Sequence, residues 1–424
     1  MKLIVKSAKN LQGTVTIPGS KSQSIRALMI ALLSKGETKI ENSLDSEDTR
    51  DAKKLCQDLG AELLSHSIKS RGLPLKTNAL NLNSGNSGIS TCFILPILGL
   101  RENSEQEIIL DCREQMRRRP IKSLISALKN LGMHIEHDTL PIKIRGKLMG
   151  GKTEVDGSNS QYLSALLLAL PCAPNDSEIR VRNLQERPYV ELTLSWLRKH
   201  NIHYVHRQEA DWDIYGIKAN QQYHAIDVDV PGDYSSASYA IIAAAMLPGT
   251  VCICGLAEDD PQGDKKLICI LEKMGADITV EKNKVIIRGG KPLKGLRIDA
   301  GDIPDLLPTL AVLGVYAQGK TEIINVAHAR IKETDRIKSM MEGLQKLGAK
   351  IEEREDGMTI YQSDLQGTLV QGFDDHRTVM ALSVAGLLAR GITKITTAEA
   401  INKTYPSYVE DMQKILANME LRDE

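Results

Sequence analysis

Residues 22–40, SQSIRALMIALLSKGETKI, decide the fold because two later segments repeat their pattern. Residues 236–256 read SASYAIIAAAMLPGTVCICGL, and residues 375–395 read DHRTVMALSVAGLLARGITKI. Each segment opens with a Ser or Asp that suits a helix N-cap and continues as a run that is apolar on nearly every side. A short Gly-containing turn and a strand pattern follow. Because a helix that is apolar all round must be covered, we expect three buried helices.

Related segments occur six times, at intervals of roughly 70 residues. Most copies are followed by an amphipathic helical pattern and a further strand, as in LCQDLGAEL at residues 55–63 and ISALKNLGMHI at residues 125–135. The alternative, an ordinary α/β enzyme with coincidental similarity, does not account for six helix pairs in the same order. The copies begin near Ser22, Ser87, Ser160, Ser236, Asp305 and Asp375.

The repeats predict an α/β fold of two lobes with three units each, in which helices pack against helices and the sheets lie outside. The Pro-Gly turn in VDVPGDY, residues 228–234, indicates the lobe junction. Residues before Pro18 are too few for a unit of their own and are expected to complete the other lobe. The predicted domains are residues 19–230, and residues 1–18 together with 231–424.

Composition excludes several classes of partner. Lys plus Arg and Asp plus Glu number 54 each in 424 residues, so no overall charge attracts nucleic acid or an acidic membrane. Two Phe and two Trp leave few aromatic platforms for bases. The N-terminal apolar run is too short for a signal peptide, and no stretch has eighteen uninterrupted apolar residues. We therefore expect a cytoplasmic protein.

The seven cysteines contain no Cys-x-x-Cys pair, which argues against a zinc site or a disulfide framework. Cys252 and Cys254 are expected on one face of a strand, as alternating core residues are. We therefore expect inert thiols and no metal.

Five segments place cations or hydroxyls at predicted helix starts, where backbone amides favour anions. Alone, each fits a solvated charged turn, but their recurrence at equivalent helix starts that could face one cleft favours a site for anionic ligands. A His–Arg pair on the last apolar helix in particular needs a partner or a ligand. The segments are PGSKS at 18–22, MRRRP at 116–120, KETDR at 332–336, DDHR at 374–377 and KTYP at 403–406.

Two of these segments carry further expectations. At least one arginine of residues 117–119 should point inward if the ligand is anionic. Lys332 and Arg336 are expected on one helical face, with Glu333 beside them.

The order of these motifs resembles that of the 5-enolpyruvylshikimate-3-phosphate (EPSP) synthases, within the enolpyruvyl transferase family. The matching segments are PGSKSQSIRAL, NSGNSG, RRRPI, SQYLSALLLALP, RPYVELTL, PGDYSSASY, QGDKKL, IPD, RIKETDRI, DDHR and KTYP. The resemblance implies two lobes of three βαβαββ-type units that close over the substrates without metal or organic cofactor. The implied reaction transfers the enolpyruvyl group of phosphoenolpyruvate to the 5-hydroxyl of shikimate 3-phosphate and releases phosphate, a step of chorismate and aromatic amino acid biosynthesis. It also implies small-molecule partners only, and a monomer.

The resemblance also implies residue roles. Glu333 would protonate the methylene carbon, Lys21 and Asp305 would manage the proton of the attacking hydroxyl, and His376 would line the catalytic site. Phosphoenolpyruvate would be bound by Lys21, Gly88, Arg119, Arg336, Arg377 and Lys403. The acceptor would be bound by Lys21, Ser22, Arg26, Asn159, Ser160, Gln161, Tyr189, Asp305, His328 and Lys332. By the same resemblance, residues 19–230 form the acceptor lobe and residues 231–424 belong to the phosphoenolpyruvate lobe.

Some positions depart from the family pattern. Asn159 stands where Ser is usual, Glu186 stands near another phosphate-binding Ser, and His328 replaces Asn. Ile89 and Cys92 lie in a loop whose usual Thr and Arg are missing. Two alternatives follow: an enolpyruvyl transferase for a different hydroxyl acceptor, and a weakened paralogue that acts as a binding protein. We expect Arg187 to pair with Glu186, so that shikimate 3-phosphate remains the acceptor.

Overall fold

The structure is a computed structural model that describes residues 1–423, and its chain divides into two compact units. Unit 1 contains Met1–Ser20 and Pro231–Glu424, and unit 2 contains Lys21–Val230. Each unit has its own cluster of buried apolar side chains, and no residue of one cluster belongs to the other unit. The fold is therefore described unit by unit.

The described residues contain six four-stranded sheets of the same topology, three in each unit. In every sheet the first two strands are parallel, and the third and fourth strands are antiparallel to their neighbours. The sheets of unit 2 are β14 (Val228–Asp229), β3 (Lys35–Glu41), β5 (Ser67–Arg71), β4 (Glu62–Leu63); β6 (Asn81–Asn83), β7 (Ile108–Asp111), β9 (Ile142–Arg145), β8 (His134–Glu136); and β10 (Gly151–Asp156), β11 (Ser177–Arg182), β13 (Trp212–Ile217), β12 (Tyr204–Glu209). The sheets of unit 1 are β2 (Gly13–Thr16), β15 (Gly249–Cys254), β17 (Lys284–Gly289), β16 (Asp277–Glu281); β18 (Arg297–Asp299), β19 (Lys320–Ile324), β21 (Gly357–Tyr361), β20 (Lys350–Arg354); and β22 (Leu369–Val370), β23 (Ile392–Ile395), β1 (Lys2–Lys6), β24 (Met419–Arg422).

Helices alternate with these strands along the chain. Unit 2 contains α1 (Lys21–Leu33), α2 (Glu47–Asp58), α3 (Gly88–Ile97), α4 (Glu114–Arg117), α5 (Lys122–Asn130), α6 (Ser160–Ala169) and α7 (Arg187–Lys199). Unit 1 contains α8 (Tyr234–Met246), α9 (Lys266–Met274), α10 (Leu307–Tyr316), α11 (Arg336–Lys346), α12 (His376–Leu388) and α13 (Tyr408–Lys414). Short 3₁₀ helices are η1 (Leu98–Leu100), η2 (Leu170–Cys172), η3 (Gly263–Lys265), η4 (Pro304–Leu306), η5 (Ala327–Ile331) and η6 (Ala398–Lys403).

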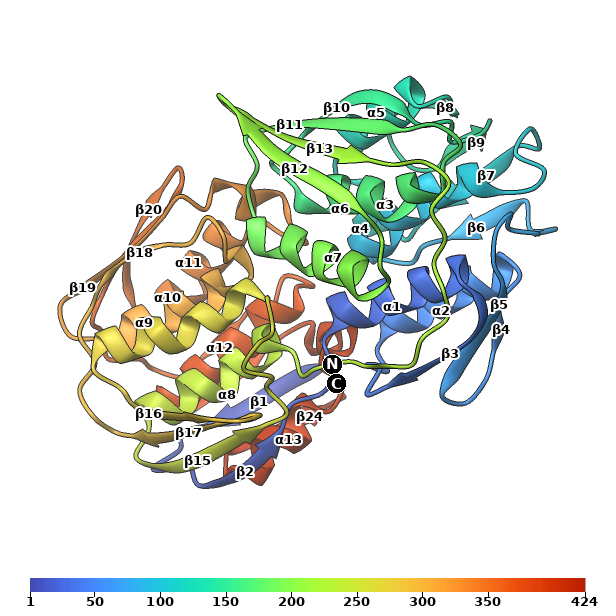
Figure 1. The fold of residues 1–424 in the computed structure, drawn as a ribbon. Helices are drawn as coiled ribbons and strands as arrows, with labels where there is room; N and C mark the ends of the chain where they lie inside the picture. The colour runs from blue at the N-terminus through green and yellow to red at the C-terminus, as the bar shows by residue number, and fades with distance from the viewer. Residues whose placement is uncertain (424) are drawn as a thin grey trace. The chain divides into compact units, whose positions relative to one another are not determined.

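One helix in each repeat is buried on all sides, as the apolar runs predict. All thirteen residues of α8 are buried, and α8, α10 and α12 pack against one another inside unit 1 while the strands lie at its outside (Figure 1). In unit 2, α3 packs against α1 and α6. The predicted α/β fold with inner helices and outer sheets is confirmed.

Two strands pair in one unit although the next helix in the chain belongs to the other unit, as was expected for the residues before Pro18. β2 precedes α1 in the chain, yet β2 pairs with β15 of unit 1, and β14 precedes α8 but pairs with β3 of unit 2. At the chain ends, β1 pairs with both β23 and β24 within unit 1. Each of these two strands, β2 and β14, therefore completes a sheet of the unit that the chain is about to leave.

The helix starts differ in detail from the sequence prediction. Asn159, rather than Ser160, caps α6, and Asp233, rather than Ser236, caps α8. Asp305 lies in η4 before α10 and does not cap that helix. Ser87 and Asp375 cap α3 and α12 through their side chains. Short polar side chains with backbone outside the helix perform this capping.

Cys252 and Cys254 do share one face of a strand, but that face is not the core. Val251 and Ile253 of β15 are buried at 1% and 0% exposure, whereas both cysteines are half-buried on the opposite face. Successive side chains of a strand point to opposite faces, so the alternation is right and its assigned direction is wrong.

Candidate active site

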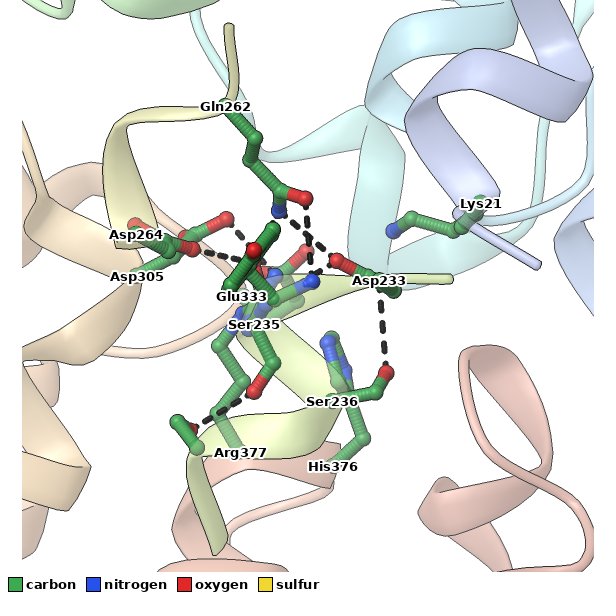
Figure 2. A network of polar contacts seen from close by, with 12 residues as sticks. Lys21, Asp233, Ser235, Ser236, Gln262, Asp264, Asp305, Glu333, His376 and Arg377 are labelled. Carbon is green, nitrogen blue, oxygen red and sulfur yellow. Dashed lines mark hydrogen bonds and ion pairs between the residues drawn. The ribbon is translucent and has the colours of Figure 1, made fainter. Parts of the chain in front are cut away.

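Unit 1 contains a cluster of opposite charges around the buried side chain of Arg336, the first residue of α11. Its Nε donates to Asp375 over 2.8 Å, its Nη1 to Asp305 over 2.7 Å, and its Nη2 to Glu333 over 2.6 Å. Arg336 is 1% exposed. Arg377, on the first turn of α12, donates a second hydrogen bond to Asp305 over 2.6 Å (Figure 2). Three segments that are distant in the sequence, around residues 305, 333–336 and 375–377, therefore meet in this cluster.

The electrostatics of this cluster favour the ionised forms of Asp305 and Arg336. Burial alone would raise the pKa of Asp305, but the charges of Arg377 and Arg336 outweigh it and hold that pKa well below its usual range. Burial alone would lower the pKa of Arg336, but Asp375, Glu333 and Asp305 raise it above its usual value. A buried charge is tolerable only when it is paired and hydrogen-bonded, and here each requirement is met.

The start of α12 and the end of η6 supply further candidate groups. The side chain of Asp375 caps the helix by accepting from the backbone N–H of Arg377 over 2.7 Å, and the same carboxylate receives Arg336. His376 follows at 1% exposure. Lys403, at the end of η6 and buried, donates its Nζ to the backbone oxygen of Asp374 over 3.1 Å. The predicted residues Arg377, His376 and Lys403 thus all come from this part of unit 1.

The expected helical face of Lys332 and Arg336 is not observed. α11 begins only at Arg336, with Asp335 as its N-cap, so Lys332 and Glu333 lie in the turn before the helix. The side-chain carboxylate of Asp335 accepts from the backbone N–H of Lys338, so the helix begins here and does not extend back to Lys332. Glu333 still reaches Arg336 from the turn. His328 lies in η5, half-buried.

A carboxylate network that the sequence interpretation missed lies beside Asp305. The side-chain nitrogen of Gln262 donates to Asp233 over 2.7 Å and to Ser235 over 2.9 Å, and Ser235 donates to Asp264 (Figure 2). Burial raises the pKa of Asp264 to about 7, and the negative charge of Asp305 adds to that rise. The segments PGDYSSASY and QGDKKL contained the signal, because they place buried polar residues at a helix start.

In unit 2, Lys21 begins α1 and pairs with a carboxylate of α2. Its Nζ lies 3.1 Å from Asp48, and the two side chains are 13% and 5% exposed. Ser22 follows Lys21, and its backbone oxygen accepts from Arg26 over 2.9 Å. The catalytic candidate Lys21 is thus held by an ion pair inside its own unit.

Arg26 is buried without a carboxylate partner among the described residues. Its Nε donates to the hydroxyl of Thr193 over 2.9 Å, and its Nη2 to the backbone oxygen of Tyr189 over 3.0 Å. With the bond to Ser22, three of its five N–H groups are occupied by neutral acceptors. Burial lowers the pKa of Arg26 to about 9. A guanidinium group with unused donors is suited to receive an anion.

The loop before α3 brings Gly88 against Arg119. A Cβ atom at Gly88, the first residue of α3, would lie 2.6 Å from a guanidinium nitrogen of Arg119, so a side chain here would displace the end of Arg119 from this position. Arg117 and Arg118 instead pair with Asp111 and Glu114 at the surface. Of the three arginines, Arg119 is therefore the one directed inward.

Cys92 lies on α3. Its side chain is 1% exposed, and burial raises the pKa of the thiol to about 12. The thiol remains protonated and adds no charge to the site.

A side-chain carboxylate of the protein itself is hydrogen-bonded to the candidate acceptor residues at the start of α6. Glu186, 2% exposed, accepts from both the backbone N–H of Ser160, over 3.2 Å, and its hydroxyl, over 2.7 Å. Asn159 caps α6 by accepting from the backbone N–H of Gln161 over 3.0 Å. Tyr189 lies on α7, just after Glu186. The N-terminus of α6 therefore already carries an anion.

Arg187 has a carboxylate partner that the sequence did not predict, and its expected pairing with Glu186 stays a prediction. Both of its terminal nitrogens donate to Asp213, over 3.0 and 2.7 Å, and Asp213 also contacts His206 over 2.9 Å. Such a two-bonded fork is the most favourable arginine–carboxylate geometry. Because Asp213 on β13 lies beside the start of α7, tertiary packing decides this pairing.

Two absences apply to the part of the chain that the structure describes. Residues 1–423 contain no group of three or more His, Cys, Asp or Glu side chains placed to hold a metal ion. No helix within them is long and apolar enough to cross a membrane.

The fold defines the class of protein first. EPSP synthase from Acinetobacter baumannii has the same fold, with a TM-score of 0.83, 24% identity and coverage of 100% of both chains. The chain thus has the inside-out α/β fold of these enzymes.

Sequence comparison then defines the family. Residues 5–412 match the family described as EPSP synthase (3-phosphoshikimate 1-carboxyvinyltransferase). The chain is 40% identical to 3-phosphoshikimate 1-carboxyvinyltransferase of Acetivibrio thermocellus, covering 99% of each, and 39% identical to that of Ruminiclostridium cellulolyticum, covering 97% of this chain and 98% of the relative. The chain belongs to the EPSP synthase family.

Proposed function

We propose that this chain transfers the enolpyruvyl group of phosphoenolpyruvate to the 5-hydroxyl of shikimate 3-phosphate and releases inorganic phosphate. Family membership along residues 5–412 supports the reaction. The observation that carries it is the buried guanidinium of Arg336 with Asp305 and Glu333 around it. This arrangement places a cation for an anionic substrate next to two groups able to move protons.

On the phosphoenolpyruvate side, Arg336 and Arg377 offer planar forks for a phosphate or a carboxylate. We assign Lys403, Arg119 and Lys21 to the same substrate, with Gly88 allowing Arg119 its position. An incoming anion that takes the fork of Arg336 releases Glu333 from its ion pair and favours protonation of Glu333. Glu333 then delivers a proton to the methylene carbon as the hydroxyl oxygen adds to the neighbouring carbon.

Elimination completes the reaction. The tetrahedral adduct loses phosphate, and a proton leaves the methyl carbon, so that the carbon–carbon double bond forms again. We assign the proton of the attacking hydroxyl to Asp305 and Lys21, with His376 lining the site. Asp264 and Gln262 position this part of unit 1 through their hydrogen bonds to Ser235.

On the acceptor side, the unused donors of Arg26 suit the carboxylate or phosphate of shikimate 3-phosphate. Ser22, Asn159, Ser160, Gln161 and Tyr189 form the remaining acceptor set in unit 2. From unit 1 we assign Asp305, His328 and Lys332. The assignment of the acceptor to residues 19–230 and of phosphoenolpyruvate to the other unit stays a prediction.

The decisive experiment follows phosphate release by purified protein given phosphoenolpyruvate and shikimate 3-phosphate, each alone and both together. Release that requires both substrates is expected. Binding of both without release would instead identify a weakened paralogue that acts as a binding protein. Release with unphosphorylated shikimate in preference to shikimate 3-phosphate would identify a different acceptor.

We further propose that the protein is cytoplasmic and monomeric, and that it acts on small molecules without nucleic acid, membrane, metal or organic cofactor. Sedimentation equilibrium of the purified protein tests the monomer, with a mass of 46.7 kDa expected. Activity that survives treatment with a chelator and dialysis is expected as well.

A further inference from the structure

Two thiols meet on the solvent-facing side of the outer sheet of unit 1, apart from all the groups assigned above. The sulfur atoms of Cys252 and Cys254 on β15 lie 3.7 Å apart, and both side chains are half-buried. Their register partners on the two neighbouring strands are Thr14 and Thr16 of β2, and Ile286 and Lys284 of β17. The thiols are thus held in one orientation by strands on both sides.

We propose that Cys252 and Cys254 form a bidentate binding site for a thiophilic metalloid, trivalent arsenic. Two thiolates on one centre with bonds of about 2.3 Å and bond angles of about 90–110° lie about 3.3–3.8 Å apart, which includes the separation observed here. Because only these two ligands converge, a three-coordinate centre with one further substituent fits the site. A tetrahedral structural metal would need two more protein ligands.

A bridging atom suits this strand better than a direct disulfide. Residues two apart in an extended strand have Cα atoms separated by about 6.6 Å, near the upper end of the range of about 4.4–6.8 Å that disulfides allow. An inserted arsenic atom needs no further approach of the two Cα atoms.

The surroundings of Cys252 favour its protonated thiol. Burial raises the pKa of Cys252, and its hydrogen bond with Cys254 adds to the rise. Lys284 and Glu281, which pair over 2.8 Å, are the charged neighbours of the thiols. Condensation with an organic arsenoxide is balanced without an oxidant: two S–H bonds are lost, two As–S bonds form, and the arsenoxide oxygen leaves as water.

The probe is phenylarsine oxide, added in equimolar amount to the full chain, with intact-mass spectrometry as the readout. One adduct that has lost one water is expected. It should be displaced by a dithiol but resist a monothiol at equal concentration, because two attachment points raise retention by about 100-fold or more. Displacement by the monothiol as readily as by the dithiol would overturn bidentate binding.

Three variants complete the test. Cys252→Ser and Cys254→Ser should each abolish the dithiol-specific adduct, whereas Cys269→Ser, which removes an exposed single thiol on α9, should not. Phosphate release equal to that of the parent shows that all three variants are folded. An adduct that persists in both single variants, or one lost in Cys269→Ser, would place the site elsewhere and refute the proposal.

Discussion

Arg336 in unit 1 and Arg26 in unit 2 are both almost fully buried, at 1% and 2% exposure, yet their partners differ. Arg336 donates to three carboxylates, and Arg26 donates to a hydroxyl and two backbone oxygens. The first charge is compensated within the fold, so stability depends on it. The second is solvated by neutral dipoles only, so its counterion is expected from outside the protein.

The comparison teaches that burial of an arginine does not by itself define its role. A carboxylate partner raises the pKa of Arg336 above its usual value, whereas burial without one lowers the pKa of Arg26 to about 9. Substitution of Arg336 should therefore lower stability as well as activity, whereas substitution of Arg26 should lower mainly the affinity for the acceptor.

The largest effect is expected for Arg336→Met. Removing this guanidinium leaves Asp305, Glu333 and Asp375 without their shared counterion, which should lower the free energy of unfolding by about 3–5 kcal/mol and abolish phosphate release. Urea denaturation measures the loss. The matched control is Arg288→Met, which removes an exposed pair with Asp277 in the same unit and should cost about 1 kcal/mol or less. Equal losses in the two variants would show that the buried network does not stabilise unit 1.

Glu333→Gln should lower kcat by about 10²–10⁴ while both substrates still bind, because an amide keeps the shape but is not a general acid. Steady-state phosphate release and equilibrium binding of phosphoenolpyruvate measure the two quantities. Glu342→Gln on the exposed side of α11 is the control and should leave kcat unchanged. A kcat of Glu333→Gln within about threefold of the parent would remove Glu333 from the role of acid.

Arg26→Met should raise KM for shikimate 3-phosphate by about 10–100-fold and change KM for phosphoenolpyruvate little, because charge-assisted hydrogen bonds to the acceptor are lost. Arg101→Met is the control: Arg101 is also buried in unit 2 and also donates to backbone oxygens, of Leu98 and Gln106. Acceptor KM values that rise equally in both variants would mean that Arg26 is only structural.

The pH dependence of stability should also differ between the units. Burial lowers the pKa of His200 in unit 2 to about 4, so the unfolded chain binds a proton first as pH falls below about 6.5. This effect removes about 2 kcal/mol of stability between pH 7 and pH 5. Asp264 in unit 1 acts with the opposite sign. Its raised pKa means that the folded protein holds this proton more tightly than the unfolded chain does, so its contribution to the free energy of unfolding is lost as pH rises through about 7.

The variant His200→Gln isolates the unit 2 effect. Its urea-denaturation free energy should fall about 2 kcal/mol less than that of the parent between pH 7 and pH 5. The exposed His134→Gln should behave like the parent. Identical pH slopes for the parent and His200→Gln would contradict the assignment.

The smallest effect is expected for Glu186→Gln. The amide oxygen can still accept from Ser160, but the negative charge beside the proposed acceptor phosphate is gone, so affinity for shikimate 3-phosphate should rise by up to about tenfold. Affinity for unphosphorylated shikimate should not change, and Glu191→Gln at the surface of α7 should change neither. An unchanged affinity for the phosphorylated acceptor would place the phosphate away from Ser160.

Much of the candidate site could be predicted from the sequence because its groups lie at helix starts. The motifs around Lys21, Asp305, Arg336 and Arg377 follow directly from where the apolar runs begin. Arg119 was expected as one of three arginines, and the structure distinguishes it by its contact with Gly88.

Pairings between distant segments were not predictable in this way. The sequence interpretation considered only Glu186, its neighbour in the chain, as a partner of Arg187, and the fork that joins Arg187 to Asp213 on β13 was not foreseen. The ion pair of Arg336 with Asp375 and the network of Asp264 were missed for the same reason. Hydrogen-bond partners depend on which helix starts converge, and that convergence is not written in local spacing.

The sequence by itself determined the six repeats, the buried helices and the family, because apolar periodicity and motif order are local properties of the chain. Only the tertiary structure decided which carboxylate neutralises which cation, that Cys252 and Cys254 face away from the core, and that Arg26 is buried with neutral acceptors alone. The physical reason is that a charge is stabilised by whatever group lies within hydrogen-bonding distance, and packing of helices from separate repeats sets those distances.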